Sequence, residues 1–272
     1  MKTVSADKIK DAVARLCVEA NLVLRSDVLK ALKTALSKEK NKRPRRILNA
    51  IIENAAIAKK EKLAICQDTG LPVVFLKIGQ SVVIKGDLTA AVNKGIVEGY
   101  KRASLRNSIV PCPVTRGEPG FSPAVIHTEI VRGDKIRITV LPKGFGCENK
   151  SQLKMFKPTA SDKDIKRFII DAVKAAGPDA CPPYVVGVGV GGTADYACLL
   201  AKKALLGSVI KLSAPEKELM REINKLGIGP MGLGGSATCV AVKIMTFPTH
   251  IAGLPVAVNI SCHALRSASR EI

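Results

Sequence analysis

The pentapeptide Cys66-Gln67-Asp68-Thr69-Gly70 marks the point where the pattern of the chain changes. Before it, in residues 5–59, apolar residues recur at helical spacing, and Ser5 stands where an N-cap is expected. After it, residues 71–78 form an apolar run typical of a buried strand. The pentapeptide therefore places a thiol, an amide, a carboxylate and a hydroxyl in a helix-to-strand loop, where functional sites are commonly built. The alternative is a buried cysteine followed by an aspartate that caps a turn.

The rest of the chain alternates between strand-like and helix-like segments, with no internal repeat and no clear linker. We expect strands at residues 73–78, 81–84, 124–132, 135–141, 184–190, 238–247 and 255–259, and helices at 88–96, 165–173, 193–206 and 215–226. Gly133-Asp134 predicts a hairpin between the third and fourth of these strands. The sequence thus predicts a single domain over residues 1–272 of mixed α/β class, in which a helical N-terminal layer packs on a mixed β-sheet with crossover helices.

The composition limits the class of protein. Of the 272 residues, 47% are hydrophobic but only 3% are aromatic, so the core must be aliphatic. No apolar run approaches the roughly 20 residues that a membrane span needs, and the N-terminus lacks a signal-peptide pattern, so we expect a cytoplasmic protein. A net charge of +20 is compatible with nucleic acid, an acidic partner subunit or anionic substrates. The few scattered aromatic residues provide no stacking platform, which makes nucleic acid the least favoured of the three.

Glycines are concentrated in several segments. Gly187, Gly189 and Gly192 match G-x-G-x-x-G between a strand and a helix, but no acidic residue for a ribose stands near Leu212. Close packing of helix on strand explains these glycines more simply, although anion binding at the helix N-terminus stays open. Residues 227–236 form a glycine-rich loop that lets another group approach the backbone. Residues 142–150 are either a second site, with main-chain N–H groups directed at an anion, or an ordinary turn.

The eight cysteines divide into two groups. Three of them (Cys17, Cys198 and Cys239) fall within helix or strand patterns, where we expect them to belong to the core. The other five lie in or beside loops, and no C-x-x-C pair occurs, so compact zinc and ferredoxin spacings are excluded. Three widely separated thiolates, from Cys66, Cys181 and Cys262, are what an iron–sulfur cluster with one iron lacking a protein ligand would need. Spacing alone does not decide between such a cluster and inert loop cysteines.

Seven motifs occur in order along the chain: Cys66-Gln67-Asp68-Thr69-Gly70, Lys143-Gly144-x-Gly146-x-Glu148-Asn149-Lys150, Cys181-Pro182-Pro183, Gly191-Gly192-Thr193, Gly232-Leu233-Gly234-Gly235, Pro248-Thr249-His250 and Leu254-Pro255-Val256-Ala257-Val258-Asn259-x-x-Cys262-His263-Ala264. Over about residues 5–267 the chain resembles the iron–sulfur-dependent hydro-lyases, namely the class I fumarate hydratases and L(+)-tartrate dehydratases. The likeness is to the α subunit, or N-terminal region, of these enzymes.

The resemblance implies a site as well as a fold. It implies a 4Fe–4S cluster held by Cys66, Cys181 and Cys262, whose fourth iron binds the hydroxyl and a carboxylate of the substrate. It implies that Asp68 is an acid/base group and that His250 is a carboxylate donor or proton group. It further implies that Arg106 clamps a carboxylate, which suits a planar guanidinium, with Gln67 and the Gly146 N–H as further substrate contacts. The substrate would be a four-carbon dicarboxylate.

The chain also departs from the resemblance. Cys147 stands where the family usually has a small hydroxyl or alanine, so this thiol is either inert or a spare thiol near the cluster. The chain ends without the further domain of the single-chain enzymes, which implies a separate β subunit and an α2β2 assembly. Fumarate hydration to (S)-malate is the expected reaction, with L(+)-tartrate dehydration as the alternative. A nucleotide-binding module and a basic nucleic-acid-binding protein are the alternatives outside this class.

Overall fold

The computed structural model describes residues 2–272, and the chain divides into two compact units. Unit 1 comprises the chain up to Arg25, Ala55–Phe145 and Arg266–Ile272, and unit 2 comprises Ser26–Asn54 and Gly146–Leu265. Helix α3 (Lys42–Glu61) runs from unit 2 into unit 1. That the whole chain behaves as one domain stays a prediction.

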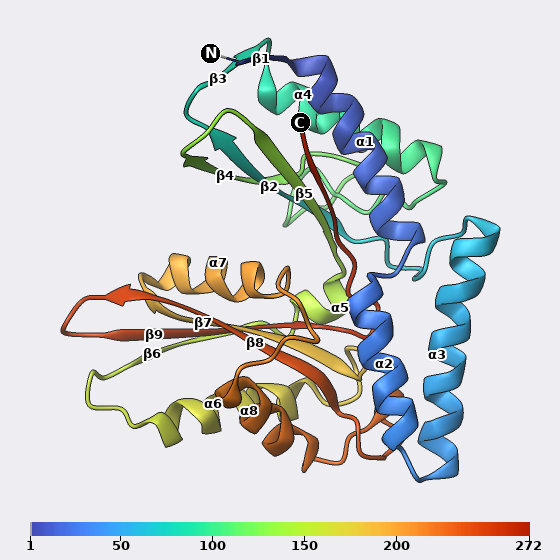
Figure 1. The fold of residues 1–272 in the computed structure, drawn as a ribbon, viewed down its shortest axis with the longest axis vertical. Helices are drawn as coiled ribbons and strands as arrows, with labels where there is room; N and C mark the ends of the chain where they lie inside the picture. Colours follow the sequence, from blue (N-terminus) through green and yellow to red (C-terminus); the bar gives the residue numbers. More distant parts are fainter. Residues whose placement is uncertain (1) are drawn as a thin grey trace. The chain divides into compact units, whose positions relative to one another are not determined.

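Unit 1 combines two helices with short sheets (Figure 1). Its elements are β1 (Lys2–Ser5), α1 (Ala6–Leu22), β2 (Leu71–Gly79), β3 (Val82–Lys85), α4 (Leu88–Arg102), β4 (Val125–Val131), β5 (Ile136–Lys143) and β10 (Ala268–Glu271). The Oγ of Ser5 accepts a hydrogen bond from the backbone N–H of Lys8 at 3.3 Å, which confirms Ser5 as the N-cap of α1.

The main sheet of unit 1 has the order β10-β5-β2-β4. Strand β2 is parallel to β4 and antiparallel to β5, so the sheet is mixed. The predicted hairpin is therefore wrong: strands β4 and β5 both exist, but β2 lies between them and pairs with each. Strand β2 is apolar and buried along most of its length, which suits a central position.

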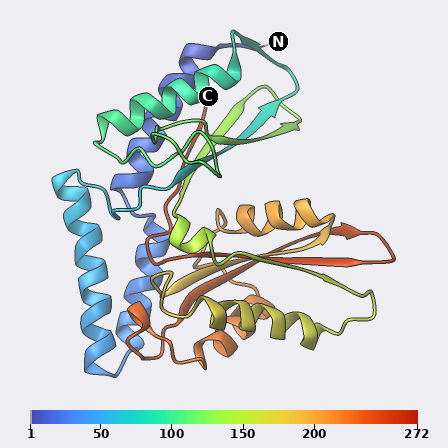
Figure 2. The ribbon, with the colours of Figure 1, turned by 180° about the vertical axis from the view of Figure 1, so that it is seen from behind.

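Helices α1 and α4 pack closely beside each other over this sheet, as Figure 2 shows from the opposite side. Their axes approach so closely because of two glycines in α4. A Cβ on Gly95 would lie 2.4 Å from the carbonyl oxygen of Lys10, and one on Gly99 would lie 2.6 Å from that of Ala14. The core beneath them is mainly Val, Ile, Leu and Ala, as the composition predicts.

Unit 2 is built on a second mixed sheet with the order β6-β9-β7-β8. Its elements are α2 (Ser26–Lys38), α5 (Phe145–Glu148, whose first residue belongs to unit 1), β6 (Gln152–Phe156), α6 (Asp162–Ala176), β7 (Tyr184–Gly192), α7 (Ala194–Ala204), α8 (Ala214–Asn224), the 3-10 turn η1 (Pro230–Gly232), β8 (Cys239–Thr249) and β9 (Leu254–Ser261). Strands β7 and β8 are parallel, and β9 is antiparallel to β7 and β6.

Strand β7 explains why this sheet has helices on both faces (Figure 1). Val186 and Val188 belong to the core cluster formed with α6 and α8. Gly187 and Gly189 alternate with them and contact α7, because successive side chains of a strand point to opposite faces. A Cβ on either glycine would lie 2.1 Å from a carbonyl oxygen of α7. Helix-on-strand packing, the simpler of the two predictions for these glycines, is thus confirmed.

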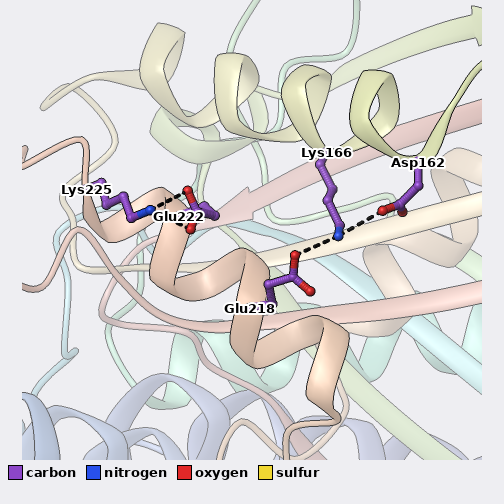
Figure 3. Close-up of polar contacts among 5 residues, drawn as sticks. All are labelled: Asp162, Lys166, Glu218, Glu222 and Lys225. Atoms are coloured by element: carbon purple, nitrogen blue, oxygen red, sulfur yellow. Dashed lines mark hydrogen bonds and ion pairs between the residues drawn. The ribbon is translucent and has the colours of Figure 1, made fainter.

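One ion pair connects the two helices on the other face of the sheet, and two further pairs lie within or next to a single helix (Figure 3). Lys166 of α6 lies 2.8 Å from Asp162 on its own helix and 2.7 Å from Glu218 of α8. Lys225, just after α8, lies 2.7 Å from Glu222. Such exposed pairs contribute little to stability, so most of the attachment of α6 and α8 comes from the apolar cluster beneath them. The architecture as a whole confirms the mixed α/β class.

Candidate active site

In unit 1, the Asp68 carboxylate is fixed by two backbone amides. Its Oδ1 accepts a hydrogen bond from the N–H of Gly70 at 2.9 Å, and its Oδ2 accepts one from the N–H of Phe145 at 2.8 Å. Gly70 has a φ of +74°, and a Cβ there would lie 2.8 Å from the backbone of Lys143. Glycine is therefore required at the end of the pentapeptide, because the loop turns tightly against the end of β5.

The same loop holds Arg106. The Oγ1 of Thr69 accepts a hydrogen bond from the N–H of Arg106 at 3.1 Å, and the Nη1 of Arg106 donates to the carbonyl oxygen of Gln67 at 3.5 Å. The buried Tyr100 hydroxyl donates to the carbonyl oxygen of Thr69 at 2.9 Å. The structure thus brings Arg106 to the loop that carries Cys66, Gln67 and Asp68, so that three of the predicted substrate-contacting residues (Gln67, Asp68 and Arg106) lie together.

Cys181 and Cys262 lie together at one end of the sheet of unit 2. His263, which follows Cys262, has its Nδ1 3.0 Å from the carbonyl oxygen of Cys181, and its backbone N–H donates to that oxygen at 3.4 Å. Since a carbonyl oxygen can only accept, Nδ1 carries the proton. Cys181 has a φ of +57°. The two cysteine-bearing turns are thereby tied to each other by a histidine that sequence patterns alone did not link to Cys181.

The glycine-rich loop packs on the Cys181 turn. The backbone N–H of Met231 donates to the carbonyl oxygen of Pro182 at 2.7 Å, and a Cβ on Gly232 would lie 2.2 Å from the Cβ of Pro178. On its other side the loop is held by the buried Glu39, which accepts hydrogen bonds from the N–H and Oγ of Ser236 at 2.7 and 2.8 Å. The groups that approach the backbone of this loop are therefore other segments of the same chain.

Helix α5 lies at the same end of this sheet. The Sγ of Cys147 is buried and donates to the carbonyl oxygen of Ala180, the residue before Cys181, at 3.4 Å. Glu148 accepts hydrogen bonds from the Nζ of Lys202 and, at 3.0 Å, from the Nδ2 of the buried Asn259. These contacts fix α5 in place. Gly146 is exposed and lies in the first turn of α5, where backbone N–H groups have no acceptor within the helix.

His250 lies at the opposite end of the same sheet. It is exposed, in the turn between β8 and β9, and its Nδ1 accepts a hydrogen bond from the N–H of Ala252 at 3.2 Å. Strand β9 runs from Leu254, near this turn, to Ser261, beside Cys262. At about 3.3 Å per residue, the strand separates His250 from Cys181 and Cys262 by about 25 Å. Within one chain, the structure does not bring His250 to these cysteines.

Comparisons with known proteins identify the kind of protein. A sequence model of the family described as "Fumarate hydratase (Fumerase)" matches residues 10–271. The chain belongs to this family. It is 42% identical over 97% of its length to the "Putative L(+)-tartrate dehydratase subunit alpha" of Methanocaldococcus jannaschii, of which 98% is covered. It is 28% identical over 97% of its length to the "L(+)-tartrate dehydratase subunit alpha" of Escherichia coli K12, of which 91% is covered.

The fumarate hydratase family consists of hydro-lyases, and the resemblance found in the sequence is confirmed. The chain is accordingly a hydro-lyase. Among residues 2–272 no helix is long and apolar enough to cross a membrane. The predicted substrate-contacting and cysteine residues are divided between the units, with Cys66, Gln67, Asp68 and Arg106 in unit 1 and Gly146, Cys181, Cys262 and His250 in unit 2.

The cysteines fit the iron–sulfur cluster that the family implies. Thiolates are the usual ligands of such clusters. The three expected ligands are each partly exposed, in loops. Cys17 and Cys239, in contrast, are buried as predicted, and burial raises the pKa of each thiol to about 12, so neither is suited to act as a ligand. The prediction that Cys198 belongs to the core is wrong, because it lies on the exposed side of α7. Over residues 2–272 no three His, Cys, Asp or Glu side chains form a group that could hold a metal ion, and the assignment of the ligands stays a prediction.

Proposed function

We propose that the chain is the α subunit of a 4Fe–4S-dependent hydro-lyase that converts fumarate to (S)-malate reversibly, with a separate β subunit completing the active site. The observation that carries this proposal is the Asp68 carboxylate, which two amides fix in the loop after Cys66 with Arg106 beside it. This arrangement provides an oriented proton acceptor and a cation for a carboxylate, next to a thiol that can bind iron.

Cys66, Cys181 and Cys262 would hold the cluster. When bound, it supplies a Lewis-acid iron that stabilises the hydroxide leaving or adding at the substrate. The imidazole of His263 supports this by keeping the Cys181 and Cys262 turns together through its bond to the Cys181 carbonyl oxygen. Mutation of residues that orient ligands in this way typically lowers metal affinity or activity by about 10- to 100-fold.

Asp68 would exchange the proton at the carbon next to the hydroxyl-bearing one. That proton is only weakly acidic, so an aligned base is needed. Each carboxylate oxygen of Asp68 already accepts one amide hydrogen and retains a second lone pair for the substrate proton. Because both oxygens are held, the carboxylate keeps one orientation through the reaction, which favours a near-attack geometry.

Arg106, Gln67 and Gly146 would bind the substrate carboxylates. The exposed guanidinium of Arg106 uses Nη1 to contact the carbonyl oxygen of Gln67, and its five N–H donors suit bidentate recognition of a carboxylate. The Gly146 N–H adds a backbone donor. Together these groups stabilise the negative charge that develops when the proton is removed.

His250 would act on the same substrate only if a second copy of the chain supplies it. The length of β9 keeps it about 25 Å from Cys181 and Cys262 within one chain. A symmetric assembly with two α chains permits such an exchange, because each copy then offers its His250 to the site of the other. The proposed α2β2 assembly meets this requirement.

The β subunit is proposed from the names of the relatives. Both relatives described above are named "subunit alpha", and the chain covers more than nine-tenths of each. A β chain would supply further groups for the substrate, and part of the net charge of +20 would contact it. We also propose that the protein is cytoplasmic. The nucleotide-binding alternative has less support, because Gly187 and Gly189 are covered by α7.

L(+)-tartrate is the second candidate substrate, and the names of both relatives favour it. The α and β chains, co-expressed and reconstituted anaerobically with iron and sulfide, should be assayed with fumarate, (S)-malate and L(+)-tartrate. We expect kcat/KM for fumarate to exceed that for tartrate. The reverse order would replace fumarate with tartrate. Activity on none of the three substrates, together with salt-sensitive retention on DNA or RNA, would contradict the enzyme proposal.

A further inference from the structure

Arg266 lies buried against the loop of unit 1 that carries Asp68, and it belongs to none of the motifs discussed above. It is 3% exposed, and its Nη2 donates to the backbone carbonyl oxygen of Asp68 at 2.6 Å. Its Nη1 donates to the Oδ1 of Asn21, at the end of α1, at 3.3 Å. One guanidinium therefore links the end of a core helix to the residue proposed as the acid/base group.

Asn21 anchors the other end of this link. Asn21 is fully buried, and its side-chain Nδ2 donates to the carbonyl oxygen of Cys17 at 3.0 Å. Its backbone carbonyl oxygen accepts a hydrogen bond from the N–H of Ile65 at 3.0 Å. Asn21 thus contacts the chain just before Cys66, and Arg266 contacts it just after Gln67. Two buried residues therefore fix the pentapeptide: Asn21 binds the residue before it, and Arg266 binds the main chain of Asp68 within it.

The charge of Arg266 makes a purely packing role expensive. A guanidinium stays protonated in proteins, and burying a cation costs free energy unless it is well paired. Among residues 2–272 the buried Nε of Arg266 has no hydrogen-bond partner. A Cβ built on Gly144 would lie 3.0 Å from the Oδ2 of Asp68 and 3.8 Å from the Nη2 of Arg266. The cation and the carboxylate thus both lie within 4 Å of one point beside Gly144, while the guanidinium donates to the main chain of Asp68.

We infer that Arg266 is a positioning residue that fixes the Asp68 carboxylate through the Asp68 main chain and Asn21. The expected effect on turnover rests on the proposed function, whereas the positioning of Asp68 does not. A lysine in its place keeps the charge but offers a single ammonium, which cannot serve the two acceptors in the same planar geometry. A small displacement of Asp68 then lowers turnover more than it lowers substrate affinity.

The test compares Arg266→Lys with Arg270→Lys, a matched change at an exposed site on β10. Hydrogen–deuterium exchange of the chain should be faster at Gly70 and Phe145, the two amides bound to Asp68, in Arg266→Lys and unchanged in Arg270→Lys. In the reconstituted α/β enzyme, kcat of Arg266→Lys should fall by about tenfold to a hundredfold, with KM changed by less than about threefold. In a second variant, Arg266→Ala, added millimolar guanidinium should restore part of the lost kcat.

Unchanged exchange at Gly70 and Phe145 would overturn the inference whatever happens to activity. A kcat equal to that of the parent would overturn its catalytic part. If the parent enzyme proves inactive on all three substrates, the proposed function fails, yet the exchange measurement still decides whether Arg266 positions Asp68. Should Arg266→Lys not fold, Asn21→Ser removes the other acceptor of the guanidinium and must give the same local change in exchange.

Discussion

The Oδ2 of Asp68 accepts a hydrogen bond from the backbone N–H of Phe145 at 2.8 Å, across 77 positions of sequence. Phe145 opens α5, and its N–H is one of the amides that a helix start leaves without an acceptor in the helix. The bond therefore satisfies an amide of α5 and orients a carboxylate at once. It explains how two separate motifs of the sequence come to serve one residue.

Replacing Asp68 with asparagine should lower kcat by a factor of about 10² or more, because positioned acid/base groups contribute 10²–10⁴-fold. The asparagine side chain also has only one acceptor oxygen, so it cannot accept from both the Gly70 and Phe145 N–H groups as the two Asp68 oxygens do. Iron content should equal that of the parent. Asp134→Asn, in the exposed turn before β5, is the matched control and should keep full turnover. A kcat for Asp68→Asn within about threefold of the parent would remove Asp68 from the mechanism.

His250 should complement in trans. His250→Ala and Cys181→Ser should each inactivate the enzyme, since one loses a substrate group and the other a cluster ligand. Subunits of the two variants, mixed and allowed to exchange, should recover roughly a quarter of parental activity, because in a two-fold assembly half of the pairs are mixed and each has one intact site. No recovery, with mixed assemblies verified by mass spectrometry, would mean that His250 does not act across copies.

Cys112 should be the thiol that reacts most readily near neutral pH among those that bind no cluster. The Thr115 hydroxyl, followed by the N–H groups of Thr115 and Val114, lowers the pKa of Cys112 to about 7. Since the thiolate is the nucleophile, alkylation by iodoacetamide should be half-maximal near pH 7, and Thr115→Val should move that midpoint upward. Cys17 and Cys239, whose pKa values burial raises to about 12, serve as internal controls. A midpoint at the ordinary thiol value would contradict the hydrogen-bonded thiolate.

Replacing Gly189 with alanine should destabilise unit 2 by about 1–3 kcal/mol, as overpacking of a filled core does. The added Cβ would lie 2.1 Å from the carbonyl oxygen of Ala197, so α7 must move away from β7. Gly253→Ala is the control, because its nearest neighbour would be the Cε of Met155 at 3.9 Å. Urea unfolding monitored by circular dichroism should show a lower midpoint for the first variant only. Equal midpoints would contradict close packing of α7 on β7.

Much of the fold could be predicted from local patterns. The helical periodicity of residues 5–59 corresponds to α1, α2 and α3, and the apolar runs correspond to β2, β7, β8 and β9. Strand pairing could not be read in the same way, because pairing depends on distant segments. Strands β4 and β5 are joined by Gly133-Asp134, yet β2 lies between them. The short polar strand β10, Ala268–Glu271, carries no apolar alternation and was missed.

The candidate site shows the same division. Its loops could be found because reactive residue types stand beside glycine and proline at the ends of strands. Arg266 could not be found, because nothing in the sequence distinguishes a buried arginine from the many exposed cations of a chain with charge +20. The separation of His250 from Cys262 was missed for another reason. Both flank β9 in sequence, and only the extended length of the strand places them at opposite ends.

The most direct test of the account is the iron and sulfide content after anaerobic reconstitution, measured together with a visible absorption spectrum. The parent chain, with its β subunit, should bind about four irons per α chain with the absorption of a 4Fe–4S cluster. Cys66→Ser, Cys181→Ser and Cys262→Ser should each fail to load, whereas Cys239→Ser, a change of a buried thiol outside the site, should load like the parent. Full loading of any of the first three variants, or no iron in the parent complex, would contradict the account.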